Sequence, residues 1–268
     1  MEHFAMVKPG TRADLAAIDP DFHEGLRKRD TEVEERLDAA RDAMRGLQER
    51  LYAEGTQSLL IVLQAMDTGG KDGTIRHVMR GLNPAGVCVA SFKVPTPVEL
   101  AHDFLWRVHP RVPRRGEIGV FNRSHYEDVL VVRVHELVPE DTWRRRYDQI
   151  NEFEELLAET GTRIIKLFLY ISKDEQKERL QARLDNPDKH WKFSTADLKE
   201  RARWDDYIAA YEDALTHCST EAAPWFVIPA NRKWYRNMIV AEIIAATLRE
   251  MDPQFPAVDF DPSQIVIE

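Results

Sequence analysis

The sequence has few cysteines, no long apolar run and no excess of positive charge. Its two cysteines, Cys88 and Cys218, are too few for a disulfide framework or a cysteine-based metal site, which agrees with a reducing compartment. No window approaches the roughly 18 apolar residues that a membrane span requires. The N-terminus lacks the basic and apolar segments of a signal peptide. These absences predict a soluble cytoplasmic protein without a membrane partner.

Acidic residues outnumber basic ones. The 268 residues include 37 lysines and arginines against 46 aspartates and glutamates, which gives a formal net charge of −9. Such a surface repels polyanions, so nucleic acid is disfavoured as a partner and any bound polyanion must meet a local basic patch. The hydrophobic share of 43% is ordinary for a globular protein and argues against disorder.

Short β-rich runs alternate with helical stretches through the middle of the chain. Runs typical of buried strands occur at residues 59–63, 87–92, 117–121, 163–171 and 225–228. Strands separated by helices predict a parallel sheet with helices on both faces. Because no long linker divides the chain, we expect a single α/β domain over residues 1–268.

Three further segments flank or interrupt this sheet. Residues 1–30 are polar and contain glycines and prolines, which predicts an extended N-terminal arm. Residues 31–54 show one apolar stripe at helical spacing, so a long helix should pack there on the domain or on a twin chain. A polar, helix-rich insertion at about 174–203 follows the fourth strand, where nucleoside-type kinases have a lid over their phosphates.

The turn after the first strand holds the strongest chemical signal. It reads AMDTGGKDGT over residues 65–74 and departs from the phosphate-loop pattern G-x-x-x-x-G-K-[ST] at Ala65 and Asp72. A buried strand that enters a glycine-rich turn and then a helix still directs backbone N–H groups toward an anion, with Lys71 as a mobile cation. An ordinary tight turn with a surface lysine is the alternative. The candidate phosphate-binding residues beside Lys71 are Gly69, Gly70, Asp72, Gly73 and Thr74.

Two acids, Asp67 and Asp72, are unexpected in a phosphate loop because carboxylates repel phosphate. A divalent cation that bridges either acid to phosphate oxygens would explain them, since Mg²⁺ favours one or two carboxylates plus substrate oxygens. Mn²⁺ is the alternative ion. Capping of the helix N-terminus is the alternative role for Asp72.

The third strand ends in GVFNRSHYED, residues 119–128. Ligands bind at the carboxyl ends of parallel strands, so Asn122 and Arg123 should lie beside the phosphate loop, with Glu127 and Asp128 one turn further on. Arg123 can hold a phosphate through two hydrogen bonds. Asn122 stands where an ordinary Walker B strand ends in Asp, which suggests that the metal-binding acid is displaced to Asp128.

The insertion after the fourth strand contains a cluster of positive charge. Arg179 and Arg183 are four residues apart and share one helix face, and Lys189 and Lys192 extend the cluster. Such runs are usually solvated surface, which is the alternative here. Their position after a strand favours a lid that closes over phosphates.

Together these segments resemble the polyphosphate kinase 2 family. The similarity runs from about Lys8 to Pro262 and is strongest in AMDTGGKDGT, FKVPTPVELAHDFLWRVHP, GVFNRSHYEDVLVVRVH and EQKERLQARLDNPDKHWKF. The segments KDGT and NRSHYEDV look like the branch that accepts both AMP and ADP. The ADP-restricted branch more often has Tyr-Asn where this chain has Tyr126-Glu127.

The resemblance implies a P-loop kinase-like three-layer sandwich, with a five-stranded parallel sheet in the order 2-3-1-4-5 and a helical lid. Nucleotide and inorganic polyphosphate would meet above Lys71 from opposite sides. Arg123 and Arg133 would contact the transferred phosphates, and Asp67 and Asp128 would organise the metal. The family also implies a homodimer or homotetramer, for which the helix at 31–54 is a candidate surface. The residues expected to bind polyphosphate in the lid are Arg179, Arg183, Lys189 and Lys192.

We therefore expect reversible, Mg²⁺-dependent phosphoryl transfer from inorganic polyphosphate to AMP and ADP. The sequence does not decide between adenine nucleotides alone and adenine with guanine nucleotides as acceptors. The acceptor oxygen is already ionised, so positioning and charge neutralisation supply the catalysis and no general base is needed. One alternative is an ATP-dependent kinase of nucleotides or small molecules on the same fold. A second is a non-catalytic phosphate-binding regulator, which would need only the glycine loop and Lys71.

Overall fold

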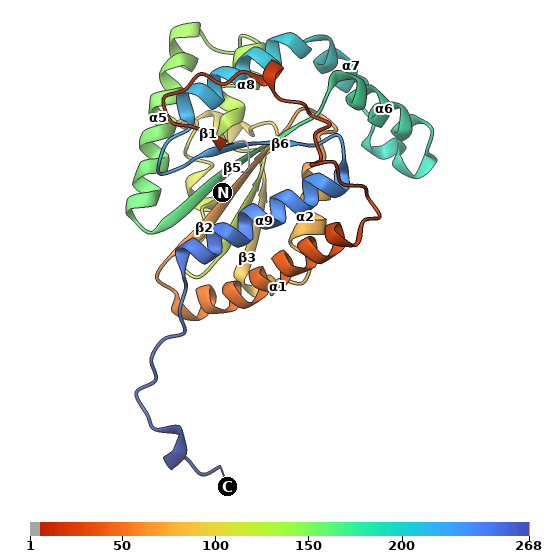
Figure 1. The fold of residues 1–268 in the computed structure, drawn as a ribbon. Coiled ribbons are helices and arrows are strands. Elements are labelled where there is room, and N and C mark those ends of the chain that lie inside the picture. The colour runs from red at the N-terminus through yellow and green to blue at the C-terminus, as the bar shows by residue number, and fades with distance from the viewer. Residues whose placement is uncertain (1–5, 268) are drawn as a thin grey trace.

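The computed structural model describes residues 6–267, and a six-stranded sheet forms its centre (Figure 1). The strand order is β1-β6-β5-β2-β4-β3. The last five strands in this order pair in parallel, and β1 runs antiparallel to β6. The strands are β1 Met6–Val7, β2 Ser58–Gln64, β3 Val87–Ser91, β4 Ile118–Asn122, β5 Thr162–Tyr170 and β6 Trp225–Pro229.

The expectation of five strands was wrong by one, although the five parallel strands have the expected order. The additional strand comes from the N-terminal arm, where Met6 pairs with Phe226 and Val7 pairs with Trp225. Two residues are too few to leave an alternating pattern in the sequence, so nothing in composition or periodicity marks them. The pairing buries Val7 and ties the arm to the edge of the sheet.

Helices cover both faces of the sheet (Figure 1). One face holds α1 Thr31–Glu54, α2 Lys71–Val78 and α9 Lys233–Met251, and the other holds α5 Glu140–Glu159 and α8 Trp204–Cys218. The shorter helices are α3 Pro97–Leu100, α4 Val131–Val134, α6 Lys173–Leu184 and α7 Thr195–Ala202. Short 3₁₀ helices lie at Leu15–Ala17, Pro84–Gly86, His109–Arg111, His125–Asp128, Pro187–Lys192 and Pro262–Gln264.

Burial explains why the central strand has no alternating pattern. All residues of β2 are buried, because helices cover this strand from both sides. The apolar stripe of α1 packs against α9, and Met44 and Leu51 are fully buried there. The stripe predicted at 31–54 is therefore covered within this chain.

The carboxyl ends of β2, β3 and β4 lie at one edge of the sheet, and their loops meet there. Helices α6 and α7, with the 3₁₀ helix Pro187–Lys192 between them, protrude from the body of the molecule on the right of Figure 1. Among residues 6–267, no helix combines the length and the apolar content needed to cross a bilayer. Both cysteines are free.

Candidate active site

The loop between β2 and α2 is tightly packed at its two adjacent glycines. Gly70 has a φ of 99°, and a Cβ at this position would lie 2.0 Å from Nη1 of Arg236. A Cβ on Gly69 would lie 2.4 Å from the Cβ of Ala65. Both positions therefore require glycine for packing, independently of any ligand. Gly70 is also the N-cap of α2, and because no side chain caps this helix, its first N–H groups are available to an anion.

Lys71 begins α2 and turns back over the loop, where its Nζ donates to the backbone O of Ala65 at 2.9 Å. Burial, followed by the positive charge of Arg123, lowers the pKa of Lys71 to about 8. The ammonium is therefore held in place but incompletely neutralised. An anion in the loop would supply the missing negative charge.

Arg123 joins the acids of two loops. Its Nη2 lies 3.0 Å from Oδ1 of Asp67, and its Nη1 lies 3.3 Å from Oε2 of Glu127. The backbone of Arg123 has a φ of 62°, as does that of Thr68 at 64°, and both are strained conformations for residues with a side chain. Arg123 thus holds Asp67 and Glu127 close together. The sequence predicted that Arg123 lies beside the phosphate loop, and its ion pair with Asp67 places it there.

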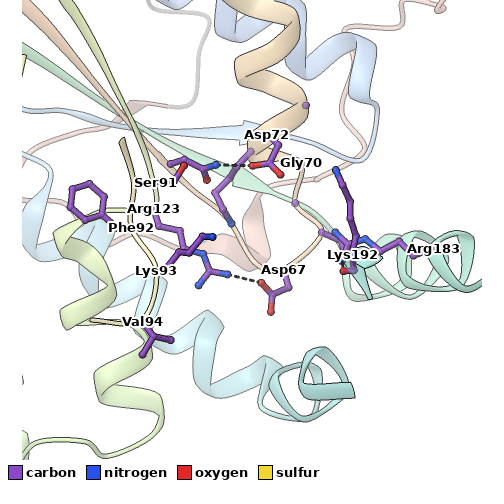
Figure 2. Close-up of a pocket in the computed structure, with 15 residues that line it drawn as sticks. Asp67, Gly70, Asp72, Ser91, Phe92, Lys93, Val94, Arg123, Arg183 and Lys192 are labelled. Carbon is purple, nitrogen blue, oxygen red and sulfur yellow. Dashed lines mark hydrogen bonds and ion pairs between the residues drawn. The ribbon is translucent and has the colours of Figure 1, made fainter. Parts of the chain in front are cut away.

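Asn122 and Asp72 form the second link between β4 and the phosphate loop. The Nδ2 of Asn122 donates to Oδ1 of Asp72 at 2.7 Å (Figure 2). Asp72 is the second residue of α2 and makes no capping hydrogen bond, so the alternative N-cap role was wrong: Gly70 occupies that position. Thr74 lies beneath the loop, where its Oγ1 donates to the O of Gly70 at 3.1 Å.

A cavity of about 540 Å³ opens above this loop. Figure 2 shows its two sides: Lys93 and Val94 extend from the segment after β3, whereas Arg183 and Lys192 approach from α6 and the following 3₁₀ helix. Arg183 is tethered to Asp197 at 3.3 Å. The predicted residues that line this cavity are Asp67, Gly69, Gly70, Lys71, Asp72, Gly73, Asn122, Arg123, Arg183 and Lys192.

A second cavity, of about 320 Å³, lies on the other side of Arg123. Asp67 and Arg123 line both cavities, so this ion pair forms part of the wall between them. Glu127, Tyr207 and Tyr211 line only the second. The second cavity therefore has aromatic and acidic walls, while the first is mainly cationic.

Arg179 was predicted to bind polyphosphate, but its guanidinium is buried and bonded to the protein. Nη1 donates to the O of Thr68 at 3.0 Å, and Nη2 donates to the O of Ala230 at 2.6 Å. Its Nε pairs with Glu175 at 2.6 Å. Arg179 therefore fixes the backbone of the phosphate loop to the segment before α9 and lines neither cavity.

Besides Thr74, which lies beneath the loop, three further predicted residues also lie outside both cavities. Arg133 pairs with Asp213 at 2.6 Å and stacks over the ring of Trp143. Lys189 is exposed on the 3₁₀ helix Pro187–Lys192.

Asp128 is the third of them, and it pairs with Arg146 at 2.9 Å. Burial raises the pKa of Asp128 although Arg146 opposes the shift. Asp128 thus lines neither of the two cavities that Asp67 lines. Within residues 6–267, no cluster of three or more histidines, cysteines or acids could hold a metal by itself.

Sequence reasoning missed two cations at this site. Lys93 lines the first cavity, and its position directly after the second expected strand could have revealed it, since the carboxyl ends of parallel strands meet. Arg236 lies under the loop, where its Nη1 donates to the O of Gly69 at 3.3 Å. No carboxylate of the described chain pairs with Arg236. Because Arg236 is far from the loop in sequence, no local motif could have linked the two.

Comparison with known proteins identifies the family of this chain. The family model for polyphosphate kinase 2 matches residues 27–256. The chain belongs to the polyphosphate kinase 2 family. An AMP/ADP-polyphosphate phosphotransferase from Meiothermus ruber is 55% identical over 98% of this chain and 98% of its own length. An ADP-polyphosphate phosphotransferase from Rhodopseudomonas palustris is 48% identical over 88% of this chain and 82% of its own.

A crystal structure of polyphosphate kinase 2 from Arthrobacter aurescens TC1 has the same fold. It superposes with a TM-score of 0.90 at 46% sequence identity, and the match covers 97% of this chain and 95% of the other. The α/β fold of this polyphosphate kinase 2 family member is therefore that of the solved relative over almost its full length.

Proposed function

We propose that this chain transfers phosphoryl groups reversibly between inorganic polyphosphate and the nucleotides AMP and ADP. The observation that carries the proposal is the cationic cavity above the glycine loop, on a chain whose formal net charge is −9. Lys71, Lys93, Arg123, Arg183 and Lys192 all line it, which matches a long polyanion better than a single nucleotide. The near full-length similarity to an AMP/ADP-polyphosphate phosphotransferase supports the choice of acceptors.

We further propose that the two cavities divide the substrates. The cationic cavity would hold polyphosphate, and the cavity lined by Glu127, Tyr207 and Tyr211 would hold the nucleotide, because aromatic and apolar walls suit a base better than a polyanion. The Asp67–Arg123 pair between them would then lie where donor and acceptor phosphates meet. This arrangement fits a P-loop kinase-like domain in which α6 and α7 act as a lid.

The proposed chemistry needs no general base. An ionised oxygen on the terminal phosphate of AMP or ADP attacks the terminal phosphorus of polyphosphate. The bridging P–O bond breaks, and the shortened polyphosphate leaves with the electron pair. Lys71 and Arg123 neutralise charge on the transferred group, and the uncompensated Arg236 holds the loop from below. Positioning and electrostatics therefore supply the catalysis.

The donor set fits a divalent cation. Asp67 lines both cavities and Asp72 lines the first, and Mg²⁺ takes one or two carboxylates together with phosphate oxygens. When bound, Mg²⁺ would neutralise phosphate charge, with Mn²⁺ as the alternative ion. We propose Asp67 as the first ligand, because it lines both cavities, whereas Asp128 lines neither. We further propose that the protein is cytoplasmic and forms a homodimer or homotetramer.

The test is a matrix of donors and acceptors. Purified protein with Mg²⁺ is given either polyphosphate or ATP as donor, and AMP, ADP, GMP or GDP as acceptor, with products resolved by chromatography. We expect ADP and ATP to form from AMP and polyphosphate, and ATP to form from ADP and polyphosphate. Transfer to AMP from ATP alone, with none from polyphosphate, would instead support an ATP-dependent kinase. Phosphate binding without turnover in any combination would support a regulator.

A further inference from the structure

A third cavity lies where the N-terminal arm meets the beginning of α9. It has a volume of about 560 Å³, and its lining comes from His23, Leu26, Arg27 and Lys28, from Glu175 and from residues 231–234. Figure 1 shows the arm crossing this region before it enters α1. The arm is fixed there, because the N of Asn231 donates to the O of Pro20 at 3.1 Å and Phe22 packs edge-on against Tyr235. These contacts therefore fix the wall that the arm contributes to the cavity.

Four cations line this third cavity: Arg27, Lys28, Arg232 and Lys233. Arg232 pairs with Asp21 at 2.7 Å. Within residues 6–267, no carboxylate forms an ion pair with Arg27, Lys28 or Lys233. The one acid in the lining, Glu175, is already engaged by Arg179. Three of the cations that line the cavity therefore have no ion-pair partner in the part of the chain that the structure describes.

The positive region continues from this cavity toward the phosphate loop. Arg179 bridges the two, since it bonds to Thr68 in the loop and to the O of Asn231 at 3.0 Å in the cavity wall. Partial desolvation, and then the charge of Arg179, lower the pKa of Lys233. Lys189 and Arg236 also lower the pKa of Lys233, so cations of α6, of the 3₁₀ helix Pro187–Lys192 and of α9 all act on this amine. A polyanion would lower this mutual repulsion.

We propose that this third cavity is a second anion-binding site, which holds distal phosphates of the same inorganic polyphosphate chain whose terminal phosphate occupies the phosphate loop. The inference rests on the proposed function for the identity of the ligand. A second site predicts that binding depends on the length of the polyphosphate chain, which the phosphate loop alone does not predict. A long chain reaches both sites and gains from two contacts, while a short chain reaches only one.

The experiment compares two double variants of the N-terminal arm. Arg27→Gln/Lys28→Gln removes two charges from the cavity, whereas Lys8→Gln/Arg12→Gln removes two exposed charges of the same arm that do not line it. Each protein is assayed for initial rate against long-chain polyphosphate, linear hexaphosphate and ADP over a salt series. Binding of long-chain polyphosphate is measured separately by calorimetry without nucleotide. A third variant, Lys233→Gln, tests the α9 side of the cavity.

We expect Arg27→Gln/Lys28→Gln to raise the KM and Kd for long-chain polyphosphate about five-fold, as two exposed ionic contacts would, and to flatten their salt dependence. Lys233→Gln should act in the same direction. The constants for hexaphosphate and ADP, and all constants of Lys8→Gln/Arg12→Gln, should stay at parental values. Equal weakening of long and short chains, equal weakening by the control variant, or no change in either constant would overturn the inference. Loss of transfer in the parent would contradict the proposed function alone, because calorimetry still reports the second site.

Discussion

The Arg123 guanidinium lies 3.0 Å from the Asp67 carboxylate and joins the loop after β2 to the end of β4. Both residues line the cationic cavity and the neighbouring aromatic one. The pair therefore lies at the boundary between the two proposed substrate cavities, and changes to it should affect donor, acceptor and metal together.

Asp67→Asn should reduce kcat/KM by about 100-fold, or ~2.7 kcal/mol, and raise the Mg²⁺ concentration for half-maximal rate. The amide keeps the shape of the side chain but loses the charge that a hard cation prefers. Initial rates over a Mg²⁺ series measure both effects. Asp128→Asn is the matched comparison: because Asp128 lines neither cavity, its Mg²⁺ dependence should shift less than that of Asp67→Asn. A larger shift in Asp128→Asn would make Asp128 the principal metal ligand.

Loss of the Lys71 proton should limit activity at alkaline pH. Burial, followed by Arg123, lowers the pKa of Lys71 to about 8, so the free enzyme loses this charge as pH rises through that value. kcat/KM for polyphosphate should therefore fall above about pH 8. kcat should persist to higher pH, since bound phosphate favours the charged amine. Lys71→Arg keeps its charge and should move the fall in kcat/KM to higher pH. A parental profile that stays flat well above pH 8 would show that Lys71 is not the titrating group.

Arg183→Gln/Lys192→Gln should raise the KM for polyphosphate and flatten its dependence on salt, because both cations line the first cavity. The KM for ADP should change less, since the proposed nucleotide cavity does not include them. Salt series with each substrate varied in turn make the comparison. Equal weakening of both substrates would indicate a general phosphate clamp and would favour the ATP-dependent alternative. If neither changed, these cations would be solvated surface.

A buried ion pair supports the segment that carries Arg123 and Glu127. Lys166 and Glu154 lie 2.5 Å apart with side-chain exposures of 0% and 1%, and Tyr126 and His125 both bond to Glu154. Glu154→Gln leaves the Lys166 charge buried and should lower the free energy of unfolding by about 3–5 kcal/mol. Urea denaturation measures the loss.

The matched control for this pair is Glu250→Gln, which breaks the exposed pair of Glu250 and Arg163 and should cost less than about 1 kcal/mol. Burial alone would raise the pKa of Glu154, but Lys166 and then His125 outweigh it and hold that pKa below its ordinary value. The stabilisation is therefore complete above the unfolded pKa and is lost as pH falls through the folded one. Similar losses in both variants would show that burial does not decide the contribution of the pair.

The sequence was sufficient for the existence of the parallel strands and for the loop that they position, whereas the strand order followed only from the resemblance to the polyphosphate kinase 2 family. Long apolar runs such as β2 are specified by burial on both faces, and the glycine turn after this run is a local feature. The strand β1 escaped prediction because its two residues form a strand only through pairing with β6. Local pattern cannot contain that information.

The candidate site was predictable where residues follow strand ends and less so elsewhere. Asp67, Arg123 and Asn122 come together because parallel strands end at one edge. Arg179 and Arg133 looked like free cations in the sequence, but each has a partner that is remote along the chain: Ala230 for the first and Asp213 for the second. Arg236 was not found because only tertiary packing brings α9 beneath the loop.

The most direct test of the central claim is transfer from polyphosphate to ADP by Lys71→Ala, measured as ATP formed per enzyme under saturating Mg²⁺. Circular dichroism and the unfolding midpoint should match those of the parent, because within residues 6–267 the Lys71 side chain makes a single hydrogen bond, to the O of Ala65. We predict a loss of turnover of about 10²–10³-fold, as when one preorganised electrostatic contact to a transition state is removed. Near-parental turnover in a folded Lys71→Ala protein would contradict the assignment of this loop as the site of phosphoryl transfer.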